Sequence, residues 1–458
     1  MRIKILLALL ILVMSGKVIS QSDDSLIIRN IYSEALTSTI SYGNLQYLCK
    51  NIGGRICGSP QSEIAIDWVK NVLKDMNLDN VYLQECMVKQ WVRGEKEISY
   101  INSSTNGKYY FNCCALGMSI GTGEDGISAN VIEVKSFDEL KSLGREKVEG
   151  KIVFFSRAAD QRFINTGSGY GNAVDQRVHG AIEAAKLGAI GVVIRSATVA
   201  LDSFPHTGIM RYEDSTKRIP AIAISTKDAE RLSTFLKNDP SLNFYFRTTC
   251  IENPEVKSYN VIGEIKGREF PEEIILVGGH LDSWDTGEGA HDDGAGIVQG
   301  IEVLRLYKEL NIKPKHTIRF VAYMDEEIAQ RGAKKYAEIV KSMNEKHIAA
   351  IESDGGGFTP TGFSVDASDT VVSVMQKWLR ILRPYDLFFI EKGGSSVDVW
   401  FLKDLGFPLI GLDVESQRYF DSHHSPNDVF EKVNRRELQL GSAAMASLIY
   451  LIDEYGLK

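Results

Sequence analysis

The chain has 458 residues, of which 44% are hydrophobic and 24% are charged. This is the composition of a globular protein with a large core, and the length predicts two or three domains. The formal net charge is -8 and no basic run occurs, which argues against a nucleic-acid partner.

The N-terminus has the pattern of a secretory signal peptide. A basic start at Arg2 and Lys4 precedes an apolar run over residues 5–14, and small residues lead to Ser20. The run is too short to span a bilayer, and no later segment is long and apolar enough to do so. We therefore expect cleavage near Ser20, no membrane span, and a secreted or lysosomal protein.

The cysteines and one sequon bear on the same compartment. In an oxidising compartment Cys49 and Cys57 are able to close a short loop, although pairing does not follow from sequence. Asn102 begins a glycosylation sequon, which predicts a glycoprotein in a host that glycosylates. All six cysteines lie outside the C-terminal acidic and histidine clusters, so we do not expect them to bind metal: Cys49, Cys57, Cys86, Cys113, Cys114 and Cys250.

The predicted secondary structure of the first half of the chain changes near residue 125, from mostly helices to short strands. Residues 26–80 read as mostly helical, with an amphipathic helix over 65–73. The glycines of residues 167–171 only loosely resemble a phosphate-binding loop, and we expect a flexible loop there. We interpret residues 125–250 as a small inserted α+β module. Strands are expected before the insert at 81–83 and 98–101, and within it at 130–134, 151–155 and 190–194, with a helix at 181–186.

From residue 258 onward, short apolar strands alternate with amphipathic helices. This pattern predicts an α/β fold whose mostly parallel central sheet is flanked by helices on both faces. The expected strands are 274–277, 318–323, 348–351 and 409–412, and the expected helices are 296–310, 332–343, 370–382 and 438–455. The predicted domains are a signal peptide (1–20), an N-terminal part of the main domain (21–124), the insert (125–250), and a C-terminal part with the functional site (251–458).

Acidic and histidine residues follow four of these strands. In open α/β sheets, ligands collect beyond the carboxyl ends of the strands. A mixture of neutral imidazole and carboxylate oxygen suits divalent cations, so the series predicts a metal-dependent hydrolase. The candidate residues are His280, Asp292, Glu326, Glu327, Asp354 and His424.

Local chemistry suggests separate roles for some of these side chains. Asp282 is placed to accept the second ring N–H of His280 and fix its tautomer. The glycines around Asp292 favour a tight turn that presents this residue and then starts a helix, with Asp293 as an acidic cap. Of two adjacent carboxylates, one can bind metal while the other takes a proton from a water that the metal acidifies. No Gly-x-Ser-x-Gly elbow with partners in order appears, which disfavours a serine hydrolase.

Taken in order, these motifs resemble the di-zinc aminopeptidase family, which includes glutamate carboxypeptidase II and the glutaminyl cyclases. The resemblance covers nearly the whole chain after the signal peptide, and the insert resembles a protease-associated domain. It rests on His280-x-Asp282, Gly289-Ala290-x-Asp292-Asp293, Glu326-Glu327, Asp354 and His424-Ser425-x-x-Asp428.

The resemblance implies a zinc exopeptidase with two Zn²⁺ per chain, which hydrolyses dipeptides or short peptides with free termini and forms a homodimer. It assigns one metal to His280 and Asp354, the other to Glu327 and His424, a bridging role to Asp292, and the general base to Glu326. Two departures stand beside the base. Asp325 replaces the usual Ala or Gly, and residues 328–330 replace the usual Gln-Gly-x.

Two other functions remain as alternatives. A glutaminyl cyclase shares this fold but works with one zinc, so metal stoichiometry separates it from an exopeptidase. A receptor-like relative keeps the fold without a working site, but such relatives typically lack parts of the ligand set, and this chain lacks none.

Overall fold

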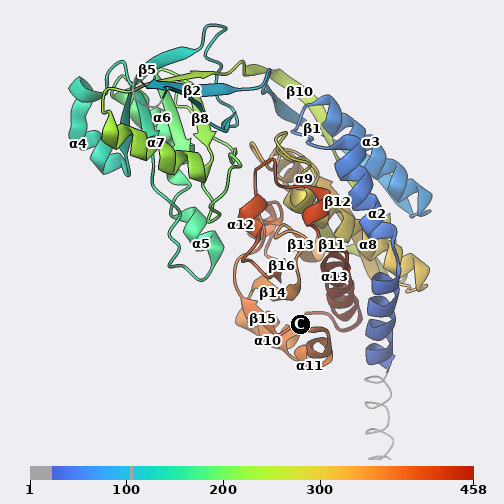
Figure 1. Cartoon of the computed structure of the whole chain (residues 1–458). Coiled ribbons are helices and arrows are strands. Elements are labelled where there is room, and N and C mark those ends of the chain that lie inside the picture. The colour runs from blue at the N-terminus through green and yellow to red at the C-terminus, as the bar shows by residue number, and fades with distance from the viewer. Residues whose placement is uncertain (1–22, 104–106, 458) are drawn as a thin grey trace, which may run out of the picture.

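Two units make up the fold, each built on its own eight-stranded sheet (Figure 1). The computed structural model describes residues 23–103 and 107–457. The predicted signal peptide, residues 1–20, lies outside the described residues, and so does Ser104 of the sequon. Within the described part of the chain no helix is long and apolar enough to cross a membrane.

The first sheet carries the predicted α/β architecture. Its central strands β12, β11, β13 and β16 are parallel neighbours, while β1, β10 and β14 add antiparallel pairs, so the sheet is mixed. Parallel strands need crossover helices, and these are present between them. In spatial order the strands are β1 (Asn80–Val92), β10 (Ile251–Ile265), β12 (His316–Tyr323), β11 (Phe270–His280), β13 (Lys346–Glu352), β16 (Leu409–Val414), β14 (Pro360–Asp366) and β15 (Phe389–Lys392).

Helices cover both faces of this sheet. Alternate residues of β11 point to opposite faces, because Ile275 and Val277 join one core cluster while Ile274 and Leu276 join another. The larger cluster packs under α8, α13 and α3, and the smaller one under α9 and η4. The fold class predicted from the sequence is confirmed. The helices of this unit include α2 (Ile40–Tyr47), α3 (Pro60–Asp75), α8 (Ala295–Glu309), α9 (Arg331–Met343), α10 (Asp369–Gln376), α11 (Leu379–Leu382), η4 (Val399–Leu405), α12 (Tyr419–Ser422) and α13 (Arg435–Tyr455).

The inserted unit is a second α/β layer structure. Its core also has two faces, since Val153 and Phe155 of β6 join one cluster while Ile152 and Phe154 join the other. In spatial order its strands are β3 (Gly107–Tyr110), β2 (Ile98–Ser103), β9 (Asn243–Arg247), β5 (Ile127–Val134), β6 (Ile152–Phe155), β7 (Gly191–Arg195), β8 (Ala221–Ile224) and β4 (Cys113–Ala115), and its helices are α4 (Phe137–Val148), α5 (Thr166–Gly171), α6 (Asp175–Lys186) and α7 (Thr226–Asn238). Three of these strands precede residue 125, and the limits 125 and 250 stay a prediction.

One local prediction is wrong. The glycine-rich segment expected to be a flexible loop forms the short helix α5. The side chain of Asn165 caps it by accepting a hydrogen bond from the Ser168 N–H at 3.2 Å. Tyr170 of α5 stacks on Phe420 of α12 with ring centroids 4.6 Å apart. This contact with the first unit orders a segment whose glycine content disfavours a helix.

The cysteines are unpaired in the folded chain. All six are free, and five of them are buried. Cys49 and Cys57, which the sequence allowed to pair, belong to different core clusters.

Candidate metal centre

The predicted site residues meet at the carboxyl edge of the first sheet. His280 is the last residue of β11, the Glu326-Glu327 pair follows β12, and Asp354 follows β13. His424 arrives from a more distant loop, after α12. The strand ends therefore place three groups by topology alone, as expected for an open α/β sheet.

Asp292 lies between the two histidines. Its Oδ1 is 3.2 Å from His280 Nε2, and its Oδ2 is 3.3 Å from His424 Nε2. On one side Asp354 Oδ1 lies 3.4 Å from His280 Nε2. On the other side Glu327 Oε2 lies 3.1 Å from His424 Nε2. The arrangement has two sides, each with one histidine and one carboxylate, joined by the two oxygens of a single aspartate.

The donor atoms of this cluster fit divalent metal ions. Glu327 Oε1 is buried and has no hydrogen-bond partner among the described residues, and Asp292 Oδ2 has only its ion-pair contacts with the two histidines of the loop after α12. An unpartnered buried carboxylate oxygen is costly, and a cation offsets that cost. One candidate metal-binding group comprises His280, Asp292 and Asp354, whose ligand atoms lie within 4.8 Å of one another. A second comprises Asp292, His423 and His424, again within 4.8 Å.

His423 was not predicted as a ligand. Its Nε2 lies 3.7 Å from Asp292 Oδ2, and its ring stacks on that of His424 with centroids 3.5 Å apart. A sequence of two adjacent histidines gives no signal for which one faces the site.

Protonation of the metal-free cluster reflects its surplus of carboxylates. Burial opposes the charge on His424, yet Glu327 and Asp292 raise its pKa to about 9. Burial likewise opposes charge on His280, and hydrogen bonds to Asp292 and Asp354 raise its pKa well above the usual value. Burial and the nearby Asp292 raise the pKa of Glu327 to about 7. Without metal, protons on the imidazoles partly balance the carboxylates, so metal binding must displace protons.

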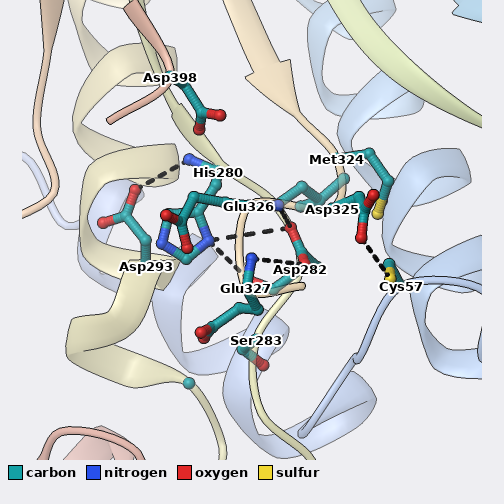
Figure 2. Close-up of polar contacts among 12 residues, drawn as sticks. Cys57, His280, Asp282, Ser283, Asp293, Met324, Asp325, Glu326, Glu327 and Asp398 are labelled. Atoms are coloured by element: carbon teal, nitrogen blue, oxygen red, sulfur yellow. Dashed lines mark hydrogen bonds and ion pairs between the residues drawn. The ribbon is translucent and has the colours of Figure 1, made fainter. Parts of the chain in front are cut away.

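Asp282 supports the site in a different way from the one predicted. Its carboxylate accepts hydrogen bonds from the N–H groups of Glu326 at 3.1 Å and Glu327 at 3.4 Å (Figure 2). The second ring nitrogen of His280, Nδ1, instead lies 3.0 Å from the Asp282 backbone carbonyl, while the carboxylate Oδ1 is 3.9 Å away. Asp282 therefore does fix the tautomer of His280, but through its backbone carbonyl. Its carboxylate is not available for this role, because it binds the N–H groups of Glu326 and Glu327.

Asp293 caps the helix after the tight turn, as predicted. Its Oδ1 accepts from the Gly296 N–H at 2.9 Å, near the start of α8. Its Oδ2 accepts from the His280 N–H at 3.1 Å and so ties the helix to the end of β11 (Figure 2). A methyl group on Gly296 would lie 2.4 Å from Asp293 Oδ2, which explains a glycine at that position.

Three supporting residues were not singled out from the sequence. Arg55 is fully buried and donates to the carbonyls of Leu281 at 2.6 Å and Gly289 at 3.0 Å, and so joins the two segments that follow β11. Asp428 accepts from the Asp292 N–H at 3.2 Å. Asp428 stood inside the motif that carried the family resemblance, whereas Arg55 lies in the segment before α3, where no residue pattern marks it.

Asp398 is the third of these residues. It is 1% exposed, and both carboxylate oxygens lack a hydrogen-bond partner among the described residues. Burial and the neighbouring Glu352 raise the pKa of Asp398 well above its usual value. Figure 2 places it above His280.

The unusual Asp325 points toward Cys57 and away from His280 (Figure 2). Its Oδ1 accepts a hydrogen bond from the Cys57 thiol, with the sulfur at 3.0 Å (Figure 2). Burial and the charge of Asp282 raise the pKa of Asp325 to about 7. Its φ of 73° lies in the left-handed region, which Asp adopts more readily than most residues that have a Cβ.

A buried set of histidines and carboxylates at the carboxyl edge of parallel strands defines a metal-dependent hydrolase of α/β fold. Residues 260–449 match peptidase family M28, and residues 114–232 match the PA domain. Mouse carboxypeptidase Q is 34% identical over 414 residues, which are 90% of this chain and 86% of the mouse protein. Human carboxypeptidase Q is 33% identical and covers 90% of this chain and 85% of its own length.

A solved structure agrees with these sequence matches. The peptidase M28 precursor from Shewanella amazonensis SB2B superposes with a TM-score of 0.90 at 33% identity, over 95% of this chain and 98% of that one. The chain belongs to peptidase family M28. The enzyme class predicted from the sequence, a metallo-exopeptidase, and the inserted PA domain are confirmed.

Proposed function

We propose that this protein is a zinc-dependent exopeptidase that hydrolyses dipeptides or short peptides with free termini. One observation carries the proposal: the two oxygens of Asp292 each face a different histidine, at 3.2 Å and 3.3 Å. A single carboxylate between two such groups suits a pair of metal ions. The similarity to carboxypeptidase Q supports an exopeptidase over an endopeptidase.

The metal ligands are proposed from the contacts on each side. His280 and Asp354 would hold one Zn²⁺, Glu327 and His424 the other, and Asp292 would bridge them. Imidazole nitrogen and carboxylate oxygen are preferred zinc ligands. Bound there, the ions would polarise the peptide carbonyl and make a water molecule more acidic.

Glu326 is the proposed general base. Its backbone is fixed through the hydrogen bond from its N–H to Asp282, which orients a side chain next to the ligand Glu327. Burial and the neighbouring carboxylates raise the pKa of Glu326, so in the metal-free protein it holds a proton readily. A group that takes a proton from the attacking water and returns it to the leaving amine contributes about 10²- to 10⁴-fold to the rate.

Compartment and assembly are part of the proposal. The N-terminal pattern supports entry into the secretory pathway, with a secreted or lysosomal protein as the product. A homodimer is proposed from the family resemblance.

Metal content measured together with hydrolysis tests this function. We expect two Zn²⁺ per chain in the purified protein, dipeptide hydrolysis that chelation abolishes, and recovery when Zn²⁺ is added back. One metal per chain with cyclisation of N-terminal glutamine would establish the cyclase alternative instead. A protein with no metal and no turnover would be a receptor-like relative.

A further inference from the structure

The inserted unit forms hydrogen bonds to the loop that carries His424. We define the clamp as residues 205–208 of that unit. The His206 ring donates from Nδ1 to the backbone carbonyl of His423 at 2.6 Å. The Thr207 N–H donates to the backbone carbonyl of His424 at 2.8 Å. Two consecutive carbonyls of the histidine pair are therefore bound by two consecutive residues of the other unit.

The clamp is itself rigidly held within the inserted unit. The His206 N–H donates to Ser196 Oγ at 2.8 Å, and Thr207 Oγ1 donates to the Ala115 carbonyl at 2.8 Å. His206 is 2% exposed and Thr207 is fully buried. Because these bonds are shielded from water, the clamp can transmit a fixed position to the histidine loop.

Gly208 brings the clamp against the ring of His424 itself. A methyl group on Gly208 would lie 2.6 Å from His424 Nδ1 and 2.4 Å from Arg177 Nη1. The φ of Gly208 is 126°, a conformation that other residues rarely adopt. Its carbonyl accepts from the Gly117 N–H at 2.9 Å, which fixes this approach. The position is closed to any larger side chain.

A second contact holds the segment that leads into the histidine pair. Helix α5 reaches from the inserted unit to α12 (Figure 1). Tyr170 stacks on Phe420 at 4.6 Å between centroids and meets His423 edge-on at 5.1 Å. Thr166 Oγ1 donates to the Ser416 carbonyl at 2.5 Å. The segment from Ser416 to His424 is thus bound to the inserted unit both at its start and at the histidine pair.

His424 needs such support from outside its own loop. Its φ of 59° is left-handed, a conformation that is strained for a residue with a Cβ. This conformation turns the ring so that Nε2 meets Glu327 and Asp292. His280, by contrast, lies in extended backbone at the end of a sheet strand.

We propose that the inserted domain completes the metal centre: the clamp sets the position of His424, so that the metal held by His424 and Glu327 depends on the inserted domain while the metal held by His280 and Asp354 does not. His206, Thr207 and Gly208 are positioning residues in this scheme, since they act through His424. The inference rests on the proposed two-metal function.

Substitution of His206 tests the clamp with metal content as the readout. We expect His206→Ala to weaken binding of one Zn²⁺ by about 10- to 100-fold, the range found when groups that orient a metal ligand are removed. After dialysis the protein would retain one Zn²⁺ per chain instead of two. His206→Asn should restore the second ion, because its amide nitrogen is as many bonds from the backbone as Nδ1 and can donate to the same carbonyl. His179→Ala, at an exposed histidine of α6, is the matched control and should retain both ions.

Gly208→Ala provides a second, steric test. It should also reduce the Zn²⁺ content to one per chain, and a titration with Co²⁺ should show visible absorption that saturates at one equivalent. Thermal unfolding and the α-helical circular dichroism of each variant establish that it is folded.

The outcomes separate this inference from the proposed function. A wild-type protein with fewer than two metals contradicts the two-metal function. Two metals in the wild type and two tightly held metals in folded His206→Ala and Gly208→Ala variants would overturn the clamp alone. Loss of both metals from a folded His206→Ala variant would also overturn it, since the His280 side would then depend on the clamp as well.

Discussion

The two sides of the candidate metal centre are built by different means. On one side His280 ends β11 and Asp354 follows β13, which are parallel neighbours in one sheet. On the other side Glu327 follows β12, but its partner His424 comes from a loop whose backbone carbonyls accept hydrogen bonds from the inserted unit. The first side follows from sheet topology, and the second requires two domains to pack correctly. Chemically similar ligand pairs can therefore differ in what their geometry depends on.

A large effect on turnover, with the metals still in place, should come from a residue assigned to neither metal. Glu326→Gln removes the proposed base but keeps the shape, so we expect kcat to fall by about 10²- to 10⁴-fold while both metals remain. Steady-state kinetics on a dipeptide and metal analysis measure the two quantities. Glu338→Gln, at an exposed residue of α9, is the control. Unchanged turnover in the Glu326 variant would exclude the role of base.

Paired histidine substitutions compare the two sides directly. We expect His280→Ala and His424→Ala each to bind one Zn²⁺ per chain, and the double variant to bind none, because each side loses the imidazole assigned to its metal. The ion left in His424→Ala should resist chelator as well as the last ion of the wild type, since both would occupy the His280 side. Metal analysis along a chelator series measures this. Retention of two ions by His424→Ala would refute the assignment.

A smaller effect, on stability, is expected at Asp325. Its pKa of about 7 in the folded protein compares with about 4 in an unfolded chain. The folded protein keeps this proton between those values, so the stability that the group contributes falls as the pH rises through that window. Asn carries no such charge and can still accept from Cys57. Asp325→Asn should therefore gain more in melting temperature over the parent at pH 8 than at pH 5, measured on metal-free protein. An equal shift at both pH values would contradict this account.

Sequence patterns predicted the parts of the molecule that depend on short-range order. The strands ending at His280 and preceding Asp354 are apolar runs, and the charged residue after each run marks the sheet edge. The edge of a parallel sheet then brings such residues together without further information. For this reason the His280 side of the centre was expected from the chain alone.

The missed features all depend on distant contacts. Helix α5 forms on a glycine-rich segment because Tyr170 meets Phe420 in the other unit. The Asp282 carboxylate turns from His280 to the N–H groups of the glutamate pair, since β11 and β12 end side by side. Arg55 supports the site through hydrogen bonds to backbone carbonyls. Every residue has such a carbonyl, so no residue pattern in the sequence predicts these bonds.

The long β1–β10 ribbon has a consequence for how the chain tolerates its insert. Val92 pairs with Ile251 at the end of the ladder, so the inserted unit leaves and rejoins the first sheet at one point. The entropy lost in closing a connection grows only with the logarithm of its length. Residues gained or lost within the insert thus leave the register of β1 and β10 unchanged. The paired strands β1 and β10 therefore allow the inserted domain to differ in length while its two connections stay fixed at the edge of the catalytic sheet.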